Sequence, residues 1–178
     1  MYIFIIDEIN RGNLSKIFGE LLMLIENDYR GTSATLAYND EKFSVSENLY
    51  IIGMMNTADR SLAMIDYALR RRFSFFEMEP GFETEGFIQY QQSLNNETFN
   101  DLLAKVIELN TEITLDRSLG RGFCIGHSYF CGRDVLSCSD EWMQEVVDYD
   151  ILPMLGEYWL DDQEKYLRWE NILHGVFQ

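Results

Sequence analysis

Two polar clusters in this sequence each follow an apolar run, and their residue types suit phosphate chemistry. Asp7 and Glu8 follow the run at residues 2–6, and Asn56 follows the run at residues 49–55. Uninterrupted apolar runs of this length are typical of strands buried on both faces of a parallel sheet, where ligands bind at the carboxyl ends of the strands. Two acids at such a tip match the Walker B pattern, in which one acid supports Mg²⁺ and its neighbour orients the attacking water. The alternative is a strand that ends in a solvated acidic turn.

The segment after the second run has two interpretations. Its sequence is Asn-Thr-Ala-Asp-Arg-Ser over residues 56–61. An asparagine at a strand tip can hydrogen-bond a γ-phosphate or the attacking water, which is a sensor role. Alternatively, Asp59 or Ser61 caps the following helix, which we expect at residues 62–69.

Three consecutive arginines, Arg70, Arg71 and Arg72, follow that predicted helix. They precede a strand-like stretch at residues 73–77. An arginine delivered to the nucleotide of a neighbouring subunit stabilises the charge that develops during phosphoryl transfer. The alternative is a basic helix end that complements the helix dipole, worth about 0.3–1 kcal/mol per cation.

Helices are expected between and after the strands, which predicts an α/β part followed by a helical part. Asn13 caps a predicted helix whose apolar positions run from 14 to 25, which ends around 26–28 and lies against the sheet. Residues 32–48 predict a short hairpin or an extended excursion. Beyond Pro80-Gly81 the pattern changes to amphipathic helices, so we divide the chain into an α/β core at 1–80 and a helical subdomain at 81–178. The predicted helices of that subdomain cover residues 99–113 and 140–147, and a third has Pro153 in its first turn.

The composition and net charge restrict the kinds of partner that this chain can bind. The net charge is −16, and residues 81–178 carry 18 acidic residues against 6 basic ones. So acidic a surface repels phosphate backbones, which disfavours direct DNA or RNA binding and suits a basic partner. No apolar run approaches the roughly 20 residues that span a bilayer, and the start lacks the pattern of a signal peptide. The sequence therefore predicts a cytoplasmic protein with no membrane segment.

The cysteines and one histidine also allow two interpretations. The chain has three cysteines, Cys124, Cys131 and Cys138, and an odd number without a secretory signal predicts reduced thiols. Cys124, His127 and Cys131 alternatively offer three metal ligands, but a fourth ligand at matching spacing is missing. His127 is either a hydrogen-bonded structural residue or a contact to nucleotide from the helical subdomain.

Three ordered motifs resemble one protein family. Residues 5–11 (Ile-Ile-Asp-Glu-Ile-Asn-Arg), 55–62 (Met-Asn-Thr-Ala-Asp-Arg-Ser-Leu) and 66–73 (Asp-Tyr-Ala-Leu-Arg-Arg-Arg-Phe) resemble the Walker B, sensor 1 and arginine-finger segments of an AAA+ nucleotidase. Together with the stretch at 122–130, they are most similar to the C-terminal half of the McrB family, the GTP-hydrolysing motor subunits of modified-cytosine-dependent restriction systems. The similarity covers nearly the whole chain. It implies the C-terminal part of an AAA+ P-loop core followed by a small all-helical lid.

The resemblance implies catalytic and nucleotide-binding roles at the matching positions, with GTP and Mg²⁺ as cofactors. Asp7 would support Mg²⁺, Glu8 would polarise the hydrolytic water, and Asn56 would be the sensor. The family also implies a hexameric ring of identical subunits and an McrC-like nuclease partner, with DNA bound through an N-terminal region or through that partner. Thr57 and Asp59 would bind nucleotide, and Asn10, Arg11 and Arg60 would lie at an interface or couple to the partner. Arg71 and Arg72 are the trans-acting candidates, and Arg72 is preferred because it adjoins the predicted strand.

One motif of the family is missing from the sequence. No G-x-x-x-x-G-K-[ST] loop occurs, so the amides and the lysine that cradle phosphates are absent. We therefore expect a fragment or truncated gene product that lacks the Walker A strand and loop, and we expect it to hydrolyse no nucleotide by itself. Two other functions stay open: an ATP-driven AAA+ remodelling protein, since GTP rests on the resemblance alone, and a catalytically dead regulatory subunit.

Overall fold

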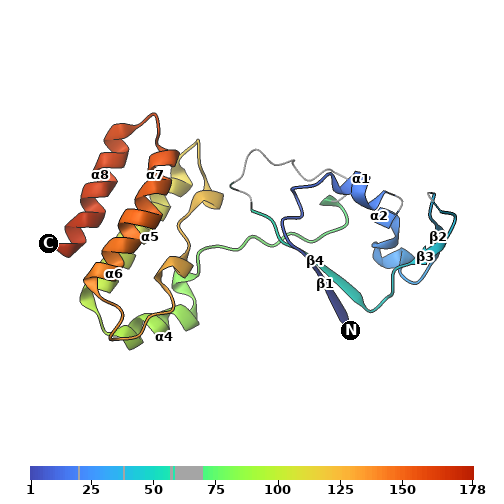
Figure 1. Ribbon diagram of the computed structural model, residues 1–178, viewed down its shortest axis with the longest axis horizontal. Helices are drawn as coiled ribbons and strands as arrows, with labels where there is room; N and C mark the ends of the chain where they lie inside the picture. The colour runs from blue at the N-terminus through green and yellow to red at the C-terminus, as the bar shows by residue number, and fades with distance from the viewer. Residues whose placement is uncertain (20, 38, 57, 59–69) are drawn as a thin grey trace. The chain divides into compact units, whose positions relative to one another are not determined.

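The structure is a computed structural model that describes the chain except for residues 20, 38, 57 and 59–69 (Figure 1). The chain divides into two units, Met1–Glu77 and Met78–Gln178, and each buries its own group of apolar side chains. The first unit combines strands with short helices, and the second is helical. In the part of the chain that the structure describes, no helix is long and apolar enough to cross a membrane.

Two parallel strands form the sheet of the first unit. Strand β1 (Tyr2–Ile6) pairs along its whole length with β4 (Leu49–Gly53), and the two lie side by side in Figure 1. Because the strands are parallel, the segments that follow them leave from the same edge of the sheet. The parallel pairing confirms the sequence-based prediction.

The chain between these strands forms short elements. The helix predicted at 14–25 is divided in two, because Gly19 takes a positive φ of +48° that ends the first helix. Leu22, Leu24 and Ile25 are buried. The elements in order are α1 (Leu14–Phe18), α2 (Leu21–Leu24), a 3₁₀ turn (Asn27–Tyr29) and the antiparallel hairpin of β2 (Ser33–Thr35) and β3 (Lys42–Ser44), which confirms the predicted hairpin.

Two predictions about the strands are wrong. The side chains of β1 are not buried on both faces, since Tyr2 and Ile5 are 68% and 58% exposed. The physical reason is that the sheet contains only two strands in the described part of the chain. The strand predicted at 73–77 is not formed either, because no described strand pairs with this segment, and Phe76 is 88% exposed.

The second unit is a bundle of helices around a continuous apolar core. Four helices begin with a side-chain cap, because Thr84, Asn96, Ser139 and Asp162 each accept a hydrogen bond from the backbone N–H three residues further on. The longest helix confirms the prediction at 99–113. The elements are α4 (Glu85–Leu94), α5 (Glu97–Leu115), α6 (Asp140–Glu145), a π-helical segment (Val146–Ile151), α7 (Leu152–Tyr158) and α8 (Gln163–His174).

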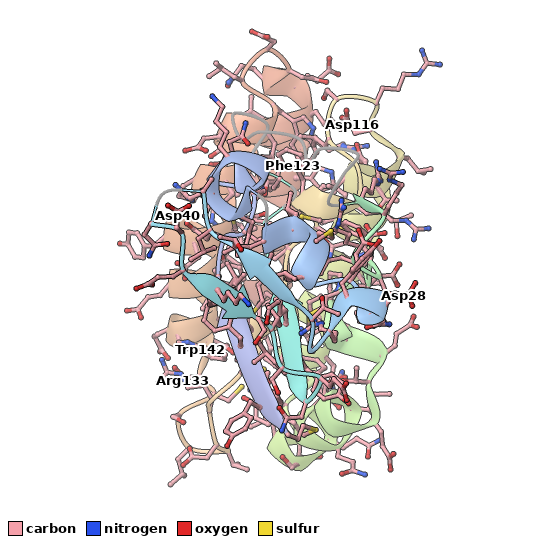
Figure 2. The ribbon with its side chains drawn as sticks, turned by 90° about the vertical axis from the view of Figure 1, so that its right-hand side faces the viewer. Asp28, Asp40, Asp116, Phe123, Arg133 and Trp142 are labelled. Carbon is pink, nitrogen blue, oxygen red and sulfur yellow. The ribbon has the colours of Figure 1, made fainter. Side chains whose placement is uncertain are left out.

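The predicted helix at 140–147 is longer than expected. Helix α6 continues through the π-helical segment into α7, and Pro153 lies in the first turn of α7 as predicted. Trp142 on α6 packs against the loop before it, where the guanidinium of Arg133 lies 5.0 Å from the centre of its ring (Figure 2). This contact is in the range of a cation–π interaction and ties the loop to the helix.

Candidate functional site

The tips of β1 and β4 are joined by backbone hydrogen bonds beyond the last pair of the ladder. The N–H of Met54 donates to the Ile6 carbonyl at 2.8 Å, and the N–H of Ile9 donates to the Met54 carbonyl at 2.9 Å. The segments that carry Asp7, Glu8 and Asn56 therefore follow adjacent strands at one edge of the sheet. Such an edge is where ligands bind in open parallel sheets.

A glycine allows the chain to fold tightly at this edge. Ile9 is buried and lies over Gly53, and a Cβ at Gly53 would stand 2.5 Å from Ile9 Cδ1. Ile9 belongs to a small core with Leu22 and Ile25, so its position is determined by the packing of helix α2. The turn after β1 is thus anchored by an apolar side chain while its acidic residues stay outside.

The two predicted catalytic acids lie on this turn. Asp7 and Glu8 are exposed, and the Glu8 N–H donates to the Asp7 carboxylate at 2.9 Å. Glu8 has a φ of +50°, a left-handed conformation that costs free energy for a residue other than glycine and is common at functional sites. The Glu8 carboxylate forms an ion pair with Arg11, and the Arg11 N–H donates to the Glu8 carbonyl at 2.9 Å.

Asn10 connects the two strand tips through its side chain. It is 8% exposed, and its amide nitrogen donates to the Asn56 carbonyl at 3.3 Å. The Asn56 side chain is exposed, and its oxygen accepts from the Ala58 N–H at 3.1 Å. The predicted sensor therefore sits on a loop that the segment after β1 holds in place. Three further predicted positions, Thr57, Asp59 and Arg60, lie outside the described residues.

The three arginines differ in their contacts. The guanidinium of Arg70 lies 5.7 Å from the centre of the Phe75 ring, and Arg72 forms an ion pair of 2.6 Å with Glu26. Arg71 is exposed and makes no hydrogen bond or ion pair with the residues that the structure describes. An open pocket of about 430 Å³ lies beside Arg71 and Arg72. One of its lining residues, Asp28, is labelled in Figure 2. The pocket is lined by Ile25, Glu26, Asn27, Asp28, Arg71 and Arg72.

In the helical unit, the structure favours structural roles for His127 and the cysteines over nucleotide or metal binding. His127 accepts a hydrogen bond from the Gly81 N–H through Nδ1 at 2.9 Å, and its ring packs against Phe82 and Phe87. The cysteines are free, and burial raises the pKa of the Cys138 thiol, which keeps it protonated. Among the described residues, no group of three or more His, Cys, Asp or Glu side chains is placed to hold a metal ion.

Sequence reasoning missed two residues that shape the first unit, Gly53 and Glu26, and one that holds a loop of the helical unit, Asn110. Gly53 had a usable signal, since a glycine inside an apolar strand marks a close approach of another part of the chain. Glu26 and Asn110 had none, because their partners are distant in sequence. Asn110 on α5 holds the backbone of Ile125 with two hydrogen bonds, accepting at 2.6 Å and donating at 2.9 Å.

Comparisons with known proteins cover most of the chain. Residues 1–73 match the family described as AAA domain (dynein-related subfamily), and residues 101–166 match the family described as McrB, alpha-helical lid domain. The chain is 53% identical over 98% of its length to the type IV methyl-directed restriction enzyme EcoKMcrB subunit of Escherichia coli, of which it spans 40%. It is 28% identical over 88% of its length to the type II restriction enzyme BsuMI component YdiS of Bacillus subtilis, of which it spans 48%. The chain thus spans less than half of either relative.

Proposed function

Since the chain belongs to the McrB family over its AAA part and its helical lid, we propose that it forms part of a GTP-hydrolysing motor in a restriction system. The observation that carries this proposal is the joining of the two strand tips by backbone and side-chain hydrogen bonds. These bonds hold Asp7, Glu8 and Asn56 at one edge of the parallel sheet. Nucleotide hydrolysis depends on groups that are held in place before the phosphates arrive.

Each residue at the tips has a separate part in this proposal. Asp7 fits Mg²⁺ because its carboxylate is exposed and offers the oxygen ligands that this ion prefers. Bound Mg²⁺ neutralises charge on the phosphates. Glu8 polarises the attacking water, for which its carboxylate has to exchange Arg11 for that water. Asn56 orients the water or the γ-phosphate through its side-chain amide, which exchanges the Ala58 N–H for the ligand.

The remaining parts of the proposal concern the assembly. An exposed arginine from one subunit would reach the nucleotide of its neighbour, which requires a ring, and we propose a hexamer with an McrC-like nuclease as partner. Both relatives are described as one subunit or component of a restriction enzyme, which supports a multi-subunit system. A net charge of −16 repels phosphate backbones, so we propose that DNA is contacted through other regions or through the partner.

A chimera tests the proposal. Residues 1–178 replace the aligned stretch of the E. coli subunit, and the purified chimera is assayed for hydrolysis of GTP and ATP. We expect GTP hydrolysis that falls by about 10²–10⁴-fold in Glu8→Gln, the range for loss of a general base. Glu77→Gln, an exposed glutamate of the same unit, is the matched control and should retain turnover. Preference for ATP, or full turnover in Glu8→Gln, would contradict the proposal.

A further inference from the structure

The ion pair between Glu26 and Arg72 is a contact that neither the AAA motifs nor the strand tips explain. Arg72 Nη2 lies 2.6 Å from Glu26 Oε1, and the side chains are 18% and 37% exposed. Water competes less for a pair that is this well covered than for an exposed pair, so the guanidinium is held in a defined place. The two residues are 46 positions apart, and only the folded chain brings them together.

Both partners extend from the same small core. Glu26 directly follows Ile25, which is buried with Ile9 and Leu22, and Arg72 directly precedes Phe73, which packs against that core. The backbone on each side of the ion pair is therefore anchored by an apolar neighbour. Because both backbones are already fixed, forming this ion pair loses less conformational entropy than forming one between flexible loops. The planar guanidinium is therefore held in a narrower range of positions.

The ion pair between Glu26 and Arg72 also makes the three consecutive arginines differ from one another. Arg72 is neutralised by Glu26, and Arg70 lies against the Phe75 ring. Arg71 stands between them, exposed, without a hydrogen bond or ion pair in the described part of the chain, and on the wall of the pocket that Glu26 also lines. Arg71 is thus available to an anion from outside the subunit, whereas Arg72 is already paired with Glu26.

We propose that Glu26 is a positioning residue: by holding Arg72 within its own subunit, it aims Arg71 at the phosphates bound by the neighbouring subunit. This inference rests on the proposed trans-acting arginine. Glu26 itself touches neither nucleotide nor water. Its effect is geometric, and a small displacement of a group that stabilises a transition state is enough to cost about 10²-fold in rate.

Arginine labelling tests the geometry on the 178-residue chain itself, without any turnover. Phenylglyoxal reacts with accessible, unpaired guanidinium groups, and peptide mass spectrometry measures each arginine separately. We expect Arg72 to react several-fold more slowly than Arg71, and Glu26→Gln to accelerate Arg72 while leaving Arg71 unchanged. Asp28→Asn is the matched control, since Asp28 lines the same pocket and forms no ion pair with the described residues. Equal reactivity of Arg71 and Arg72 in the unsubstituted chain would overturn the proposal.

Turnover of the chimera tests the consequence. Glu26→Gln should lower kcat by about 10–100-fold with little change in KM, because a trans-acting arginine acts on the transition state, and Glu26→Asp should recover part of the loss. Asp28→Asn should stay within about twofold of the parent. A Glu26→Gln variant that is less stable but keeps its kcat would show a structural role only and overturn the inference. Failure of the proposed function is seen separately, since then Glu8→Gln itself retains full turnover or the chimera prefers ATP.

Discussion

Replacing Asp116 by asparagine should destabilise the helical lid by about 2 kcal/mol. Asp116 ends helix α5, and Figure 2 labels its position. Its carboxylate accepts hydrogen bonds from Lys165 Nζ at 2.7 Å, from the Ser118 N–H at 2.8 Å, from the Ser118 hydroxyl at 2.7 Å and from Trp159 Nε1 at 3.3 Å. Lys165, followed by Ser118, holds the pKa of Asp116 well below its usual range. The carboxylate thus joins the end of α5 to α8 and to the residue after α7.

The magnitude follows from the donors that lose their acceptor. Oδ2 accepts from Lys165 and Trp159, whereas Oδ1 accepts both bonds from Ser118. An asparagine keeps one oxygen, so its NH₂ group faces one of these two sets of donors. A hydrogen bond to a charged group contributes about 1.5–3 kcal/mol, and Lys165 keeps the longer contact to Glu112 at 3.4 Å and its place over the Trp159 ring, 4.7 Å from the ring centre. In a unit of about 100 residues, 2 kcal/mol lowers Tm by about 8–16 °C.

Tryptophan fluorescence reports this change selectively. The three tryptophans, Trp142, Trp159 and Trp169, all belong to the second unit, so thermal melts of the 178-residue chain followed by their emission measure the lid. Asp101→Asn, an exposed position on the same helix, removes the same charge and should change stability by no more than about 0.5 kcal/mol. If Asp116→Asn melts together with Asp101→Asn, the reasoning is refuted.

The stability difference between Asp116→Asn and Asp101→Asn should depend on pH in a defined direction. The pKa of Asp116 is lower in the folded chain than the usual value of about 3.9, so its contribution is complete above that value and is lost as the pH falls below it. Burial alone would lower the pKa of Lys165, but Asp116 and Glu112 raise it, so its contribution is lost only as the pH rises above about 10.4. The Tm difference between Asp116→Asn and Asp101→Asn should be constant from about pH 5 to 8 and shrink towards pH 3. A difference that grows on acidification would contradict the assignment.

Three further predictions concern the first unit. The 178-residue chain alone should hydrolyse neither GTP nor ATP, because it has no phosphate-cradling loop, and sustained turnover by the purified chain would disprove this. In the chimera, Glu8→Gln and Arg71→Ala should each lower GTP turnover by at least about 10²-fold, and mixing them should recover part of it, since some interfaces then pair an intact Glu8 with an intact arginine. If Arg72→Ala behaves this way and Arg71→Ala does not, Arg72 is the acting residue. Gly53→Ala should destabilise the chain by about 1–3 kcal/mol in urea unfolding, since its Cβ would stand 2.5 Å from Ile9 Cδ1, whereas Gly86→Ala in the open space on α4 should stabilise it by up to about 1 kcal/mol.

The sequence by itself determined the family, the type of fold and most of the local elements. Apolar runs that end in polar clusters predict strands β1 and β4, and a helical segment between them favours parallel pairing, because parallel strands need a crossover of this kind. Caps such as Asn96 and the proline in α7 are also local signals, since each acts on backbone groups within a few residues. The ordered motifs at the two strand tips and in the arginine run were sufficient to identify the McrB resemblance that the relatives confirm.

Only the tertiary structure decided which of the predicted polar groups meet. Asn10 donates to Asn56, and Glu26 pairs with Arg72, in each case across 46 residues. Residue type and spacing cannot give such contacts, because they depend on how the core around Ile9 places the segments on either side of it. The exposed side chains of β1 have a similar explanation. An apolar run indicates that a strand is suited to burial on both faces, but the burial itself depends on other elements that pack against the sheet.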